Sequence, residues 1–95
     1  MQKNTDSYKI IYSRTFNKSF ARISKSNYQI AERILKTMEE VSINPYNSDM
    51  LSPPLKGARK RRVGKYRIIF EINISATPHE IHFLDVGSRE KIYKK

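Results

Sequence analysis

Residues Lys56–Arg67 read KGARKRRVGKYR, a stretch with seven basic side chains in twelve positions and no acidic one. Residues Tyr66–Ile72 (YRIIFEI), which overlap the end of this stretch, are rich in the β-branched and aromatic side chains that favour strands. Between the two arms lies a VGKY turn. The sequence therefore predicts a β-hairpin whose first arm carries the basic run.

Successive side chains on a strand point to opposite faces, so Lys60 and Arg62 are expected to project one way. Arg59, Arg61 and Val63 are expected to project the other way. A basic run of this kind is usually a solvated face or a disordered arm, but the adjoining strand pattern favours a folded surface. Because crowded like charges repel one another and serve no core, a polyanion is the natural partner of such a surface.

Chain length, cysteine content and net charge limit the classes of protein to which this chain can belong. The chain has 95 residues, of which 1–7 are predicted to be a flexible N-terminus and 8–95 a single domain. It has no cysteine, which excludes thiol catalysis, disulfides and cysteine zinc sites. With 19 Lys plus Arg against 9 Asp plus Glu, the net charge is +10, which indicates nucleic acid, an acidic protein partner, or both.

No apolar stretch approaches the ~18 residues that a membrane span needs, and no signal-peptide pattern is present. The expected location is therefore the cytoplasm, with no membrane contact.

Two helices are predicted after a first strand at Tyr8–Arg14. Thr15 can cap a short helix, which residues 24–27 then break. Ser26 and Gln29 fit a capping box that opens a second, longer helix. The apolar face of that helix comprises Ile30, Ala31, Ile34, Leu35, Met38 and Val41. Asn44-Pro45 ends it, and a long irregular connection runs to Pro54.

The last strand is predicted at Glu80–Val86, after a turn around Pro78. The element order is therefore β-α-α-β-β-β: an N-terminal strand, a two-helix hairpin and a three-stranded antiparallel meander. This is an α+β fold in which the helices cover one face of the sheet. The opposite face is expected to be concave and basic.

Three motifs in order resemble those of the RelE/ParE toxin superfamily. They are the segments 54–57 (PLKG), 62–72 (RVGKYRIIFEI) and 86–93 (VGSREKIY). The resemblance covers residues 8–95 and implies a RelE-like fold. It also implies a toxin of a type II toxin–antitoxin system that enters the ribosomal A site and cuts mRNA without a metal or other cofactor. The implied partners are the ribosome, mRNA and a cognate antitoxin.

The resemblance also implies a set of catalytic residues, carried over by position: Lys60, Arg62, Arg67, Arg89 and Tyr93. Further basic side chains are expected to contact RNA, namely Lys56, Arg59, Arg61, Lys65 and Lys91. One position departs from the family pattern, because Ser88 stands where many relatives have histidine. His79 and His82 match no family position, and structural or surface roles are expected for them.

Metal-free RNA cleavage requires that the 2′-OH lose a proton, that the leaving oxygen gain one, and that the charge developing on the phosphorus oxygens be stabilised. Lys60 and Tyr93 are both candidates for the base, since neighbouring cations disfavour a protonated lysine and favour a tyrosinate. Arg62 or Arg67 suits the phosphorane, because the guanidinium pairs with phosphate in a bidentate way. Arg89 is the candidate for the leaving group or the scissile phosphate.

Two other functions remain open. One is inhibition of DNA gyrase in the manner of ParE toxins, which tend to have a longer helical hairpin and to lack the joint set of basic strand residues and C-terminal tyrosine. The predicted short first helix and the presence of that set favour the nuclease. The other is a basic RNA- or ribosome-binding module without catalysis, which the loss of histidine at Ser88 keeps in consideration. The antitoxin is expected to be acidic and to wrap the basic face.

Overall fold

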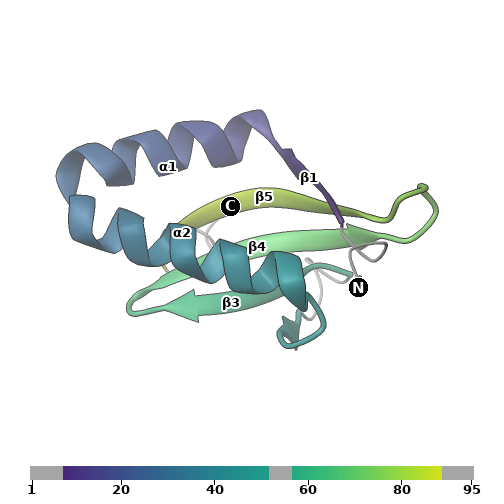
Figure 1. Cartoon of the computed structure of the whole chain (residues 1–95). Helices are drawn as coiled ribbons and strands as arrows, with labels where there is room; N and C mark the ends of the chain where they lie inside the picture. The colour runs from purple at the N-terminus through teal and green to yellow at the C-terminus, as the bar shows by residue number, and fades with distance from the viewer. Residues whose placement is uncertain (1–7, 52–56, 89–95) are drawn as a thin grey trace.

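The computed structural model describes residues 8–51 and 57–88. The chain runs through β1 (Lys9–Tyr12), α1 (Arg14–Ser26), α2 (Tyr28–Ile43), β2 (Asp49–Met50), β3 (Arg59–Val63), β4 (Tyr66–Asn73) and β5 (Glu80–Ser88). The sheet order is β1-β5-β4-β3-β2, with β1 parallel to β5 and the other pairs antiparallel. Both helices lie on one side of this sheet (Figure 1). The predicted α+β class, the helical hairpin and the β3–β4–β5 meander are therefore confirmed.

The structure adds a strand that the sequence pattern did not predict. Residues Asp49–Met50 lie within the connection read as irregular, and they pair with Lys60 and Arg59 at the edge of the sheet. A strand of two residues is too short for an alternating pattern to register. The predicted N-terminal segment 1–7 lies outside the described residues.

The helix boundaries differ from the prediction at the point where the two helices meet. α1 is not short: it is capped by Ser13 rather than Thr15 and runs through Ser26. Asn27 alone separates the helices, and its side chain accepts a hydrogen bond from the backbone N–H of Ile30 (3.1 Å). The predicted capping box at Ser26 is therefore wrong by one position, since Asn caps a helix as well as Ser does.

Replacing Asn27 with alanine is expected to lower the free energy of unfolding by about 1 kcal/mol, because the side chain caps α2. Urea denaturation measures this change. Asn27→Asp keeps the acceptor oxygen and should retain most of the stability. Equal losses in the two variants would show that the cap is not the source of the effect.

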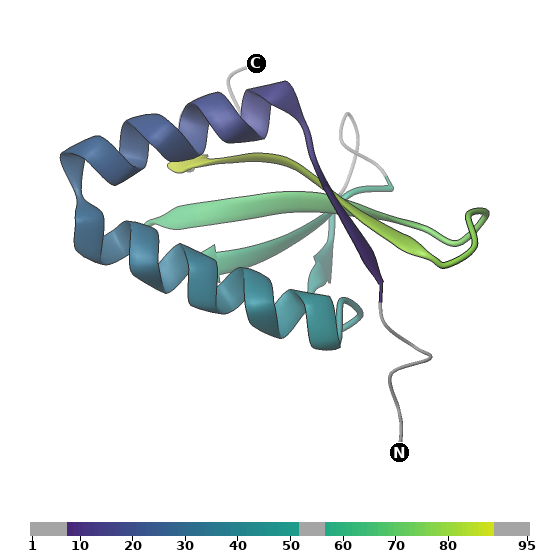
Figure 2. The same ribbon diagram turned by 45° about the horizontal axis from the view of Figure 1, so that its top comes forward.

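The main core lies between the helices and the sheet. Phe16, Ile23, Ile30, Ile34, Met38 and Val41 of the helices pack on Val63, Ile68, Phe70, Ile81, Phe83 and Val86 of the strands. α1 contacts β5 and α2 contacts β3, so the hairpin spans the sheet as Figure 2 shows. Leu35, predicted as core, is instead half-exposed.

The other face of the sheet carries a small apolar cluster of Ala58 and Ile69, with Leu51 and Leu84 packed against it. Leu84 has no in-register partner, because the β4–β5 register passes from the Ile69–Asp85 pair to the Phe70–Phe83 pair. This irregularity is a β-bulge. The face opposite the helices is thus apolar in one part, and only the remainder is available for charge.

No helix in the described ranges 8–51 and 57–88 is long and apolar enough to cross a membrane.

Candidate functional site

Three of the predicted catalytic cations lie on the sheet face that the helices do not cover. Arg62 of β3 is directly opposite Arg67 of β4, and Lys60 is two residues along β3 from Arg62. Side chains of directly opposed antiparallel residues project from the same face, about 5 Å apart at Cβ. The β3–β4 hairpin therefore brings these three cations together without any contribution from the helices.

A two-residue turn fixes this register. Val63 pairs with Tyr66, so only Gly64 and Lys65 form the loop, and Gly64 has φ +59°. Positive φ is readily adopted by glycine because it lacks a Cβ. A slip of one residue would move the cations to the helix side, so the turn chemistry positions the site.

The surroundings of Arg67 differ from those of its two neighbours. Its residue surface is only 8% exposed, whereas Arg62 is exposed and Lys60 half-buried. On β5, Arg67 is in register with Gly87, which has no side chain to occupy the space beside the guanidinium. A buried guanidinium interacts more strongly with a phosphate than an exposed one, because less water screens the charge.

The buried carboxylate of Asp85 supports this end of the sheet. Its Oδ1 accepts hydrogen bonds from the Oγ of Ser19 on α1 (2.8 Å) and from the backbone N–H of Val86 (2.8 Å). Asp85 thus ties α1 to β5 two residues before Gly87, and fixes the strand that borders Arg67.

Arg59 and Arg61, predicted to bind RNA, project toward the helix side of β3. The guanidinium of Arg61 forms an ion pair with Glu40 of α2 (2.6 Å), and that of Arg59 lies 5.0 Å from the centroid of the Tyr46 ring. The predicted alternation along β3 is therefore confirmed. These two arginines are engaged with protein groups on the helix side, although Arg61 also lines a hollow with Lys60 and Arg62.

Of the remaining predicted residues, the structure describes Lys65 alone. Lys65 is exposed in the β3–β4 turn, close in sequence to Arg67. Lys56, Arg89, Lys91 and Tyr93 lie outside the described residues. The convergence of the C-terminal arginine and tyrosine on the three sheet cations thus stays a prediction.

Ser88, at the position where the resemblance implied histidine, ends β5 in register with Tyr66. Tyr66 packs against the main core, so this pair faces the helix side and not the three cations.

The two histidines lie at the other end of β5. His82 Nε2 lies 2.7 Å from Oε1 of Glu80, and the ring of His79 lies 6.2 Å from that of Tyr8. Neither is near the three cations in the strand register, which agrees with the structural or surface roles expected for them. Within the described part of the chain, no cluster of three or more His, Asp or Glu side chains could hold a metal ion.

The hydrogen bond with His82 holds the pKa of the Glu80 carboxyl below its ordinary value of 4.5. A lowered pKa means that the ionised form is stabilised by folding, so this contribution is present above pH 4.5 and is lost as the pH falls through the folded pKa. Glu80→Gln should therefore be less stable than the parent at pH 5.5, and the difference should shrink at pH 3. Urea midpoints at the two pH values measure it; a difference that is the same at both would contradict the assignment.

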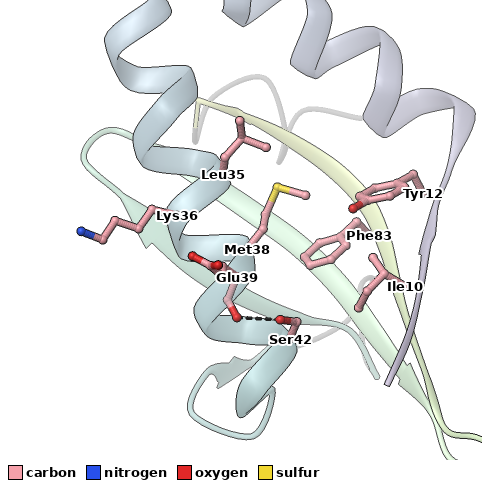
Figure 3. A pocket seen from close by; sticks show the side chains of 8 residues that line it. All are labelled: Ile10, Tyr12, Leu35, Lys36, Met38, Glu39, Ser42 and Phe83. Atoms are coloured by element: carbon pink, nitrogen blue, oxygen red, sulfur yellow. Dashed lines mark hydrogen bonds between the residues drawn. The ribbon is translucent and has the colours of Figure 1, made fainter. Parts of the chain in front are cut away.

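Two surface features were not predicted from the sequence. One is an apolar groove of about 350 Å³ between α2 and β1. Ile10, Tyr12, Leu35, Lys36, Met38, Glu39, Ser42 and Phe83 line it. Figure 3 shows the rings of Tyr12 and Phe83 facing Met38 across the groove. The helical periodicity assigned Leu35 to the core. The sequence alone could not show that this side chain lines the groove instead.

The second feature is a polar hollow of about 520 Å³ beside the site. Its walls are the segment after α2, with Tyr46, Asn47, Ser48 and Asp49, and the β3 residues Lys60, Arg61 and Arg62. Two of the candidate catalytic cations thus line a hollow whose other wall comes from a loop. The loop sequence NPYNSDM indicates a turn but not the strand that the turn approaches.

Comparisons with known proteins agree on one family. A family model described as "ParE toxin of type II toxin-antitoxin system, parDE" matches residues 10–93. The chain is 26% identical over 88 residues to "Putative toxin RelE4" of Methanocaldococcus jannaschii, covering 93% of each chain.

Solved structures show the same fold. A YoeB/ParE toxin from Agrobacterium tumefaciens superposes with a TM-score of 0.75 at 10% identity, covering 85% of this chain and 98% of that one. In the toxin–antitoxin complex RelBE2 from Mycobacterium tuberculosis, the similar chain has a TM-score of 0.74 at 20% identity, with 94% and 98% covered. For the DinJ-YafQ toxin–antitoxin complex of E. coli, the TM-score is 0.70 at 17% identity, and the match covers 92% of this chain and 98% of that one.

Proposed function

We propose, from the premise that the chain belongs to the ParE toxin family of type II toxin–antitoxin systems, that it is a ribosome-dependent endoribonuclease. Its substrate would be mRNA in the ribosomal A site, and cleavage would inhibit translation. Cleavage would proceed by attack of the 2′-OH on the adjacent phosphate, without a metal.

The observation that carries this proposal is the placement of Lys60, Arg62 and Arg67 on one sheet face, with the two arginines directly opposed. Two guanidinium groups side by side can bind several oxygens of one phosphate. The charge that develops on those oxygens during attack is then met by donors that are already in position.

The roles follow from exposure and register. Arg67, the most buried of the three, is assigned to the phosphorane oxygens, with Arg62 opposite it binding the same phosphate. Lys60 or Tyr93 removes the 2′-OH proton, and Arg89 serves the leaving group or the scissile phosphate. Lys60 has an advantage as the base, because it lines the hollow together with Arg62.

Primer extension on mRNA from induced cells tests the activity. New 5′ ends within translated codons are expected. In a separate reconstituted reaction, the same cuts should be absent when ribosomes are withheld. Tyr93→Phe tests the base: parental cleavage by that variant would leave Lys60 as the candidate. Intact mRNA together with growth arrest would contradict the nuclease.

Inhibition of DNA gyrase is the second candidate, because the structure removes one of the two sequence arguments against it. α1 has 13 residues and α2 has 16, so the short first helix that favoured the nuclease from sequence is not present. Gyrase-dependent DNA breaks in induced cells, with unbroken mRNA, would establish this function in place of the nuclease.

A cognate antitoxin is the proposed protein partner. Relatives with this fold have been solved as complexes that include RelBE2 and DinJ-YafQ. The net charge of +10 favours an acidic segment that covers the sheet cations and thereby excludes RNA. Association of the two proteins should accordingly be fast at low salt and slower as salt screens the charges.

A further inference from the structure

The hollow beside the site has a wall that the proposed catalytic roles do not use. The loop between α2 and β2 contributes Tyr46, Asn47 and Ser48 to it, and β2 contributes Asp49. None of these residues was predicted to act. β2 is the edge strand of the sheet, so the hollow lies at the border of the molecule next to β3. Its volume of about 520 Å³ falls within the range of small-ligand sites.

Tyr46 is the aromatic residue of this wall. Tyr46 is 52% exposed, although the preceding residue, Pro45, is fully buried and anchors the loop. The guanidinium of Arg59 lies 5.0 Å from the ring centroid. Arg59 is not among the residues that line the hollow, whereas Tyr46 is. The cation therefore supports the ring from outside and leaves it in contact with the hollow.

The loop that carries Tyr46 is held by several hydrogen bonds. Ser48 Oγ donates to the carbonyl oxygen of Pro45 (2.6 Å) and accepts from Arg59 (3.3 Å). Arg61 donates to the carbonyl oxygen of Asn47 (3.4 Å) and is itself fixed by Glu40 (2.6 Å). Two arginines of β3 thus brace the loop on the helix side, and little ordering remains to be done when a ligand enters.

The chemistry of the walls fits one nucleotide of single-stranded RNA. A tyrosine ring offers a face on which any base can stack, and a neighbouring arginine strengthens this by a cation–π contribution. Asn47 and Asp49 supply the amide and carboxylate groups that bind base edges. Arg62 is placed to bind the phosphate that joins this nucleotide to its neighbour, and Lys60 lines the hollow beside it.

We propose that this hollow is a subsite for a base adjacent to the scissile phosphate, with Tyr46 as the stacking ring and Arg59 as the residue that positions it. The assignment rests on the proposed function for its substrate class, RNA. It adds to that function a contact with one RNA base, and it places the neighbouring nucleotide on the Tyr46 side of the site. Lys60 and Arg62 would then connect the subsite to Arg67.

Short single-stranded RNAs with 2-aminopurine at each position in turn provide the test, because the fluorescence of this base falls when it stacks. With the free toxin in low salt, quenching is expected at one position of the bound RNA. Tyr46→Ala should abolish that quenching and weaken binding by about 5- to 100-fold. Tyr46→Phe keeps the ring and should bind as the parent does. Tyr28→Ala removes a tyrosine that is 66% exposed at the start of α2 and is the matched control, expected to have no effect.

Absence of quenching in the parent, or equal losses in Tyr46→Ala and Tyr28→Ala, would overturn the subsite. Thermal melts of each variant exclude unfolding as the cause of a loss. The ribosome assay separates the two proposals. If the parent shows position-specific quenching but cleaves no mRNA, the subsite stands and the nuclease fails. If the parent cleaves mRNA and Tyr46→Ala binds RNA normally, the nuclease stands and the subsite fails.

Discussion

Arg67→Ala is expected to lower the rate of mRNA cleavage on ribosomes by about 100- to 1,000-fold, the usual cost of removing one preorganised donor from a developing oxyanion. Arg67 is the most buried of the three sheet cations and lies directly opposite Arg62. Alanine removes the guanidinium group, and Gly87 on the neighbouring strand has no side chain that could replace it. Single-turnover cleavage of ribosome-bound mRNA, followed by primer extension, measures the loss.

Two further variants make this prediction specific. Arg67→Lys retains the charge but not the planar fork, so its activity should fall between those of the parent and Arg67→Ala. Lys18→Ala removes an exposed cation from α1, on the helix side of the sheet, and should change the rate little. Urea denaturation of each variant checks that the fold is intact. Parental cleavage by a folded Arg67→Ala protein would remove Arg67 from the mechanism.

Phe83→Ala is expected to lower the free energy of unfolding by about 3–5 kcal/mol, the range measured when a large aromatic side chain is removed from a core. Phe83 is 1% exposed and joins an aromatic cluster that spans both helix and sheet. Its ring centroid lies 5.6 Å from that of Phe16 on α1, 5.8 Å from Tyr12 on β1 and 5.9 Å from Phe70 on β4. A loss of this size is a large share of the total stability of a small domain.

The control for this prediction is Ile43→Ala at the end of α2, where the side chain is 78% exposed. Its effect should stay within about 0.5 kcal/mol, as for most surface substitutions. Urea unfolding of both proteins gives the comparison. Similar effects at the two positions would mean that the aromatic cluster does not stabilise the fold as its burial indicates.

The sequence predicted the parts of the fold that depend on local patterns. Alternation along residues 59–63 separated Lys60 and Arg62 from Arg59 and Arg61, and the short turn after Val63 fixed the hairpin. These features follow from the strand period of two and from glycine at a positive φ, both of which neighbouring residues determine. The apolar face of α2 was predicted in the same way, apart from Leu35.

Other features were decided only by packing between distant segments. The sequence cannot show that β1 pairs with β5, that Asp49–Met50 joins the edge of the sheet, or that Glu40 holds Arg61. The hollow at Tyr46 exists only because the loop after α2 meets β3. Local propensity determined which residues share a strand face, because that depends on the backbone period alone. Tertiary structure decided which of those side chains are buried, paired or exposed, because that depends on which segments the folded core brings into contact.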